Sequence, residues 1–232
     1  MAIHASVENG ERLFDDAKVL NDVSRYSTAM ALAILAEEEF AKAFLLYLIK
    51  DDALPWTPEI RQTVRDHKCK HLLAILMEHL SPTEDQLTAR LMEQIDFARQ
   101  SQLPKDVSSA INLLRHEKIG KWKDPYWDVL EPSDYDQETK RISDGSVDRA
   151  KQNALYVEIG RDGSVSTRPS AVRPFQVERE LERCKRFLDL AREISAGYVL
   201  MAKDYTLLKQ ILSAVFAPAV TSEPELQTPS DS

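Results

Sequence analysis

The chain has 232 residues, of which 43% are hydrophobic and 29% are charged, so it is long enough for one well-packed domain and ordinary in composition for a soluble globular protein. Its formal net charge of −8 argues against wholesale electrostatic binding to nucleic acid or to an anionic membrane, but leaves room for a local basic site. Glycines are few for this length and residues of high helix propensity abound, so the composition favours an all-α fold.

Helical patterns dominate the first half of the chain. Capping residues, first-turn prolines such as Pro58 and Pro82, and apolar residues at helical spacing set the expected boundaries. The expected helices run from about residue 6 to 20, 27 to 50, 58 to 79, 81 to 100 and, as a shorter element, 104 to 118.

The second half is less regular. Residues 120–150 are polar, aromatic and rich in turn formers, which predicts a long insertion. Residues 154–159 have the composition of a strand, and the turn that follows predicts a short β-hairpin over residues 154–167. A last long helix is expected from 174 to 216. The sequence thus predicts a single helical-bundle domain over residues 1–216, and a disordered tail over 217–232, which is rich in Pro, Ser, Thr and Glu.

Nothing in the sequence indicates export or a membrane anchor. The N-terminal residues lack the basic-then-apolar plan of a signal peptide, and no uncharged apolar run reaches membrane-spanning length. Cys69 and Cys184 are typical of reduced cysteines. We therefore expect a cytoplasmic protein with no membrane partner.

The segment from Ala29 to Lys50 is apolar almost all the way round, yet it carries charges in its middle. Helical spacing places Glu38 and Lys42 on the same face as apolar residues, one turn apart. Charges are rarely buried without a partner. Either an internal ion pair between Glu38 and Lys42 fixes the helix register, or the two residues belong to a site, while Glu37 and Glu39 flank the stripe in contact with solvent or an interface.

Several short motifs, taken in order, resemble the AbiV family of bacterial abortive-infection proteins, which carry a HEPN-type helical domain. The resemblance covers roughly residues 7–169, and Glu158 stands where Asp is commoner in the family. The motifs are Asp16-Ala17 with Leu20, the A-x-E-E-x-x-K core from Ala36 to Lys42, His67-Lys68-Cys69-Lys70, and the block containing Lys151-Gln152 and Leu155-Tyr156-Val157-Glu158. The resemblance implies a HEPN-like helical bundle that forms a two-fold homodimer, and a role in stopping translation or growth during phage infection.

Many HEPN proteins cleave RNA without a metal ion, using an Arg followed a few positions later by a His. Arg65, with His67 or His71, fits that signature. Histidine can move the proton of a ribose 2′-hydroxyl and arginine can hold a phosphate. However, about 240° of helix separates Arg65 from His71, so they meet only across a dimer or at a distorted helix end. The alternative is that these are surface or interface groups of a basic helix.

His67 and His71 share one helix face, with Lys70 beside them. Two histidines at this spacing can bind a metal, but the sequence indicates no third ligand, so we expect neither a metal nor another cofactor. We expect instead that one of these histidines packs against Glu38. That arrangement serves either a core polar network or an acid–base site.

A mixture of positive and aromatic side chains follows residue 114. Arg115 and His116 lead into a segment with Trp122, Tyr126 and Trp127, and such mixtures bind single-stranded RNA. The alternative is that the aromatic side chains anchor the insertion to the bundle. Tyr156 is either a core aromatic or a hydroxyl of the site.

Together these features predict an anti-phage effector that acts as a metal-independent ribonuclease at a dimer interface. Its expected catalytic residues are Arg65, His67, His71 and Glu38, and its expected binding residues are Lys42, Lys70, Arg115, His116 and Tyr156. The alternative is a non-catalytic defence module, which binds a phage protein or a component of translation.

Overall fold

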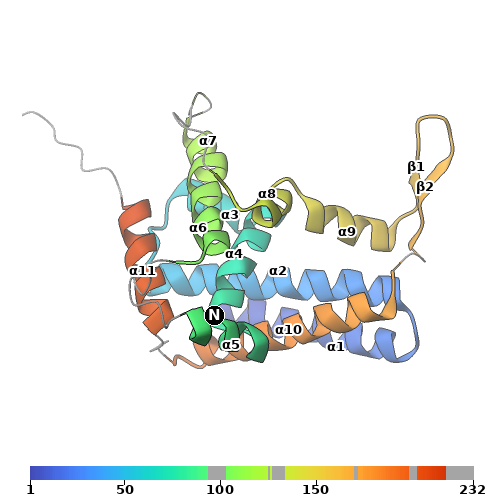
Figure 1. Ribbon diagram of the computed structural model, residues 1–232, viewed down its shortest axis with the longest axis horizontal. Coiled ribbons are helices and arrows are strands. Elements are labelled where there is room, and N and C mark those ends of the chain that lie inside the picture. Colours follow the sequence, from blue (N-terminus) through green and yellow to red (C-terminus); the bar gives the residue numbers. More distant parts are fainter. Residues whose placement is uncertain (94–102, 125, 127–133, 170–171, 199–202, 218–232) are drawn as a thin grey trace, which may run out of the picture.

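The computed structural model describes residues 1–93, 103–124, 126, 134–169, 172–198 and 203–217, and these are predominantly helical (Figure 1). The expected all-α fold is confirmed. None of the described helices is long and apolar enough to cross a membrane. The tail predicted to be disordered lies, apart from residue 217, outside the described residues.

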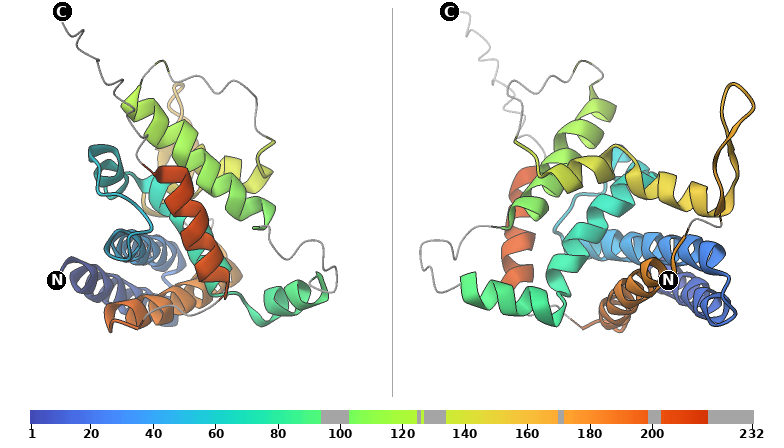
Figure 2. Two further views of the ribbon diagram at one scale, coloured as in Figure 1. Left: turned by 90° about the vertical axis from the view of Figure 1, so that its left-hand side faces the viewer. Right: turned by 45° about the vertical axis from the view of Figure 1, so that its right-hand side comes forward.

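Three long helices form the base of the bundle. Helix α1 (Ala2–Asp22) turns back into α2 (Tyr26–Lys50), and α10 (Pro174–Ser195) packs against both. Figures 1 and 2 show the three lying side by side. Gly10 lets α1 approach closely, because a Cβ atom there would lie 2.5 Å from the ring of Phe40 on α2.

Shorter helices cover the other side of α2. Helix α4 (His67–Leu80) crosses α2, and α9 (Ser146–Leu155) packs beside both. The remaining helices are α3 (Pro58–Thr63), α5 (Glu84–Glu93), α6 (Lys105–Asn112), the π-helical η2 (Leu113–Gly120), α7 (Lys121–Lys123), α8 (Gln137–Ser143) and α11 (Lys203–Phe216).

Helix α2 is the centre of the core. Its buried residues point in all directions, and α1, α10, α4 and α9 surround it. Phe40, Phe44 and Leu48 are among its fully buried side chains. One copy of the chain therefore covers the apolar surface of α2, and that surface alone does not call for a second copy.

A small β-hairpin follows α9 and extends away from the bundle (Figure 1). Strands β1 (Glu158–Ile159) and β2 (Val165–Thr167) are antiparallel, with Glu158 opposite Thr167 and Ile159 opposite Val165. The hairpin predicted over 154–167 is present, but its first two residues belong to α9.

Two predicted helices are interrupted. The one expected from 58 to 79 breaks after Thr63, because Asp66 caps a new helix by accepting a hydrogen bond from the Cys69 N–H. The one expected from 174 to 216 ends at Ser195, where Gly197 adopts φ +84°, and α11 begins at Lys203.

The segment expected to be an insertion contains α7, α8 and half of α9. Its aromatic side chains differ in role. Trp122 and Tyr135 are partly buried against the core, whereas Tyr126 is exposed, and Trp127 lies outside the described residues. Anchoring to the bundle therefore accounts for two of these rings.

Candidate functional site

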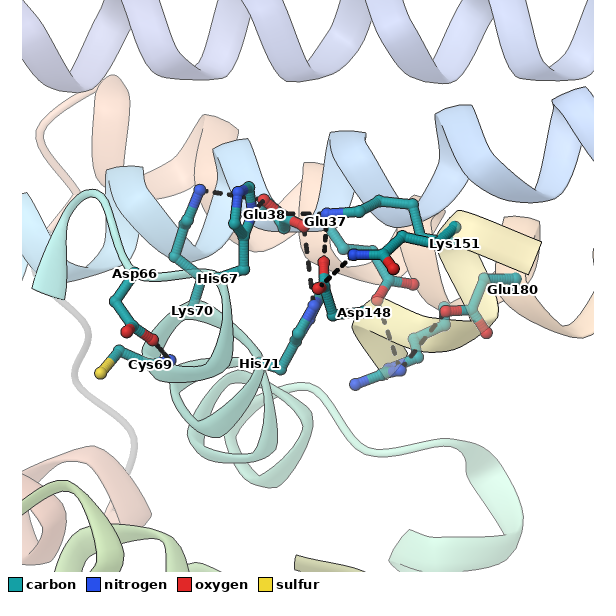
Figure 3. A network of polar contacts seen from close by, with 12 residues as sticks. Glu37, Glu38, Asp66, His67, Cys69, Lys70, His71, Asp148, Lys151 and Glu180 are labelled. Carbon is teal, nitrogen blue, oxygen red and sulfur yellow. Dashed lines mark hydrogen bonds and ion pairs between the residues drawn. The ribbon is translucent and has the colours of Figure 1, made fainter. Parts of the chain in front are cut away.

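Glu38 is the centre of a polar cluster built by three helices (Figure 3). It projects from the middle of α2, and only 2% of its surface is exposed. Helix α4 contributes His67, Lys70 and His71, and α9 contributes Asp148 and Lys151. Residues 113 positions apart in the sequence thus meet around one buried carboxylate.

Both oxygens of the Glu38 carboxylate are engaged. Oε2 lies 2.5 Å from Nδ1 of His67 and accepts a hydrogen bond from Nζ of Lys70 at 2.9 Å. Oε1 accepts a hydrogen bond from Nζ of Lys151 at 2.6 Å. The expectation that Glu38 meets the histidines of the following helical segment is confirmed.

The charge state of Glu38 follows from these contacts. Burial raises its pKa, but hydrogen bonds from Lys151, Lys70 and His67 outweigh burial and lower the pKa to about 2. Glu38 is therefore ionised at neutral pH and can only accept hydrogen bonds. It follows that Nδ1 of His67 carries the hydrogen and that a neutral His67 has its lone pair on Nε2.

His67 is the open member of the cluster. It is the first residue of α4, and 49% of its side chain is exposed although its Nδ1 faces the buried Glu38. A carboxylate that fixes the ring, while half of the side chain stays open to solvent, is an arrangement suited to proton transfer.

His71 has a different environment. It is buried, and its Nε2 lies 3.6 Å from Oε1 of Glu38. Burial lowers its pKa to about 4, against the opposing effect of Glu38. His71 is therefore neutral at physiological pH, and its ring has no exposed face for a substrate.

Arg65 lies in the break between α3 and α4 and is exposed. The helical rotation that separates Arg65 from His71 on a straight helix does not apply across this break. Asp66, which caps α4, is the single residue between Arg65 and His67. Arg65 and His67 therefore lie on either side of Asp66, the residue that caps α4.

The Lys151 ammonium lies beside three groups that could together hold a metal ion. Glu38, His67 and Asp148 offer ligand atoms within 4.8 Å of one another, which the sequence did not reveal. The Lys151 ammonium, however, contacts Glu38 Oε1 at 2.6 Å, Asp148 Oδ1 at 2.9 Å and His67 Nδ1 at 3.3 Å. Burial lowers its pKa, but hydrogen bonds to Glu38 and Asp148 raise it above its ordinary value, so Lys151 is charged.

The predicted ion pair between Glu38 and Lys42 is wrong. Lys42 pairs instead with Glu39, and both of those side chains are partly exposed. Lys70 and Lys151 take the place of Lys42, because α4 and α9 bring their ammonium groups directly to the carboxylate.

The other predicted binding residues lie on different elements. Arg115 is exposed on η2, and the neighbouring His116 is partly buried, so that burial lowers its pKa. Tyr156 follows α9, five residues beyond Lys151, and is 66% exposed, so it is not a core aromatic.

A second buried network begins at Glu37, for which contact with solvent or an interface was predicted. That prediction is wrong: Glu37 is buried, and Nη1 of Arg183 on α10 lies 3.3 Å from its Oε2. Arg183 also pairs with Glu180 and Glu78. Burial raises the pKa of Glu37, against the opposing effect of Arg183. This network joins α10 to α2 and α4.

Comparison with known proteins identifies a family. The model of the HEPN_AbiV family, described as AbiV, matches residues 1–188, a range that contains the whole Glu38 cluster. No curated protein and no solved structure matches the chain.

Proposed function

Because this chain belongs to the HEPN_AbiV family, we propose that it is an abortive-infection effector that cleaves RNA without a metal ion, with His67 as the acid–base residue. The observation that carries the proposal is the geometry of His67: Nδ1 is bound to an ionised, buried Glu38, while half of the side chain is open to solvent.

In the proposed reaction, Nε2 of His67 takes the proton of a ribose 2′-hydroxyl. The 2′-oxygen then forms a bond to the adjacent phosphorus, and the bond from phosphorus to the 5′-oxygen of the next nucleotide breaks. The proton returns to that 5′-oxygen, which leaves a cyclic phosphate and a free hydroxyl. Glu38 holds the ring and stabilises the imidazolium that forms.

Arg65 is the proposed phosphate-binding residue. It is exposed and lies two positions before His67, at the start of α4. Lys70 and Lys151 are not free for this role, because their ammonium groups are buried against Glu38. They are positioning residues that keep Glu38 ionised. His71, which is buried and neutral, belongs to the support of the site.

No step of this proposal needs a metal ion. The ammonium of Lys151 neutralises Glu38 and Asp148, which a metal would otherwise have to do. A two-fold dimer, which the family resemblance implies, would bring two such clusters into one molecule and place two Arg65 side chains near RNA.

The test is RNA decay by the purified chain in the presence of a chelator. We expect cleavage by the wild type and by His4→Ala, which removes an exposed histidine of α1 that pairs with Glu8. We expect His67→Ala to abolish cleavage, since no other histidine of the cluster is open. Cleavage by His67→Ala at the wild-type rate would refute the assignment.

A non-catalytic defence module is the second candidate. It is favoured by the charge balance of the cluster, in which two lysines are neutralised by two carboxylates and leave little free positive charge for RNA. In that case the chain blocks a phage protein or a translation component by binding it. The test compares infected cells with and without this protein. If the protein is needed for phage resistance but causes no RNA decay in infected cells, this candidate is favoured.

A further inference from the structure

The turn between α8 and α9 brings two positive side chains together beside the start of α4. Both helices pack against α4 (Figure 1), and Lys68 of α4 directly follows His67. Gly145 in the turn has φ +93°, a conformation that glycine adopts readily. A Cβ atom at Gly145 would lie 3.6 Å from Nζ of Lys68 and 3.8 Å from Nη1 of Arg149. The missing side chain therefore leaves room for both charged groups to approach the same point.

The positive charge of this region is in excess. Neither Lys68 nor Arg149 forms a salt bridge within the part of the chain that the structure describes, and neither does the exposed Arg65. Two carboxylates of the region also lack a salt bridge there: Asp66, which caps α4, and Asp144, which ends α8. Three positive groups therefore stand against two negative ones, which leaves a local site that attracts anions.

Capping of α8 explains only part of this charge. Nη1 of Arg149 donates a hydrogen bond to the Asp144 carbonyl at 3.0 Å, and Nζ of Lys118 donates one to the Ser143 carbonyl at 3.5 Å. Both contacts stabilise the C-terminal end of α8. Lys68 has no such role, because its half-buried side chain makes no hydrogen bond to any described residue. Its ammonium, and the remaining N–H groups of Arg149, are free for a ligand.

We propose that Lys68 and Arg149 bind the RNA phosphate that neighbours the cleaved one. Arg65 precedes His67 by two positions and Lys68 follows it by one, so RNA held at His67 passes both. In this arrangement Arg65 contacts the phosphate that reacts, and Lys68 and Arg149 contact the next phosphate along the strand. Phosphate contacts position a nucleic acid without reading its bases, so we expect binding that does not depend on sequence.

The inference rests on the proposed function for its ligand, and it supplies a feature that the Glu38 cluster lacks. The ammonium groups of Lys70 and Lys151 are neutralised by Glu38 and Asp148, so they attract RNA only weakly. Lys68 and Arg149 add positive charge that no carboxylate neutralises, next to the residue proposed to move the proton.

The test is binding of a single-stranded 2′-O-methyl RNA by the full chain, measured by fluorescence anisotropy at several salt concentrations. This RNA has no 2′-hydroxyl proton, so the wild type binds it without cleaving it. Lys68→Met and Arg149→Gln keep much of the shape of each side chain, and each should weaken binding about tenfold. Each should also reduce the slope of log affinity against log salt by about 0.7, the value for one phosphate contact to a single strand.

Lys185→Met is the matched control. Lys185 is an exposed lysine of α10, on the other side of α2, so the variant loses the same charge away from the site and should bind like the wild type. Lys68→Arg, which keeps the charge, should retain most of the affinity. Circular dichroism verifies that each variant is folded.

Equal binding by Lys68→Met and the wild type, or an equal loss in Lys185→Met, would overturn the inference. If the wild type also cleaves ordinary RNA, the proposed function would survive that result and only this phosphate site would be wrong. Displacement of the RNA by an equal concentration of inorganic phosphate would also overturn the inference, because the pair would then be a site for free phosphate. The expected losses of binding without any cleavage would support the phosphate site and count against His67 as the acid–base residue.

Discussion

Replacing Glu38 by glutamine removes the charge on which the whole cluster depends and keeps nearly the same shape. In the variant, Lys151 retains Asp148, but Lys70 loses the only carboxylate that the structure places against its ammonium among the described residues. The side chain of Lys70 is 8% exposed, so its charge would be buried without compensation.

The expected cost follows from the pKa of Glu38, which falls from 4.5 to about 2. At about 1.4 kcal/mol for each tenfold change in acid dissociation, the native contacts of the carboxylate contribute about 3 kcal/mol at neutral pH. That value agrees with the 3–5 kcal/mol, roughly, that follows when one partner of a buried ion pair is removed. For a chain of this size, about 3 kcal/mol lowers Tm by about 6–12 °C.

The assay is urea unfolding at pH 7, followed by circular dichroism. Glu39→Gln is the matched control, because it makes the same chemical change one residue further along α2. Its partner Lys42 is partly exposed, so we expect a loss of about 1 kcal/mol or less. If Glu38→Gln were no less stable than Glu39→Gln, the cluster would not be the buried electrostatic centre described above.

Three further results are expected. The free energy of unfolding should fall as the pH drops from 6.5 to about 4, because the unfolded chain protonates His71 in this window and the folded chain does not. Thermal melts at a series of pH values measure this dependence, and His71→Asn should flatten it between these two values. Asp66→Ala should cost about 1 kcal/mol in urea unfolding by removing the cap of α4, and equal stability would mean that water replaces the cap. Gly10→Ala should destabilise the protein despite a gain of about 1 kcal/mol in helix propensity, because the new methyl group would lie 2.5 Å from the Phe40 ring. A Tm above that of the wild type would show instead that the ring can move.

The sequence predicted the centre of the cluster and its contact with a histidine, but not the lysines that neutralise it. A glutamate inside an apolar helical stripe requires a neutralising group, and that requirement identified Glu38. The partner proposed for it, Lys42, was the nearest base in sequence, because helical spacing describes only neighbours along one helix. The actual partners, Lys70 and Lys151, are 32 and 113 residues away, and only the packing of α4 and α9 on α2 brings them together.

A signal for the α9 residues was present in the sequence. Asp148 and Lys151 are three residues apart, which places both on one helical face, and Lys151 opens one of the motifs that resemble the AbiV family. Neither observation indicated which face of the bundle they would reach. The sequence also contained a signal for the break at Asp66, because Asp is a common N-cap residue and its side chain accepts a hydrogen bond from the N–H three residues later, here that of Cys69. The helical periodicity continues on both sides of the break, and for that reason a single helix was predicted.

The charge balance of the cluster indicates how one histidine can both remove and return a proton. Glu38 and Asp148 carry two negative charges, and Lys70 and Lys151 carry two positive ones, so the cluster is neutral while His67 is neutral. When His67 takes a proton the cluster gains one positive charge, next to the position proposed for a phosphate that becomes more negative in the transition state. Removal of either lysine would leave a net negative cluster beside the position proposed for the phosphate, and that charge would repel RNA. Lys151→Met should therefore raise the KM for RNA cleavage, and added salt should reduce this effect by screening the charge, whereas a lysine with a purely structural role would lower stability and leave the salt dependence of KM unchanged.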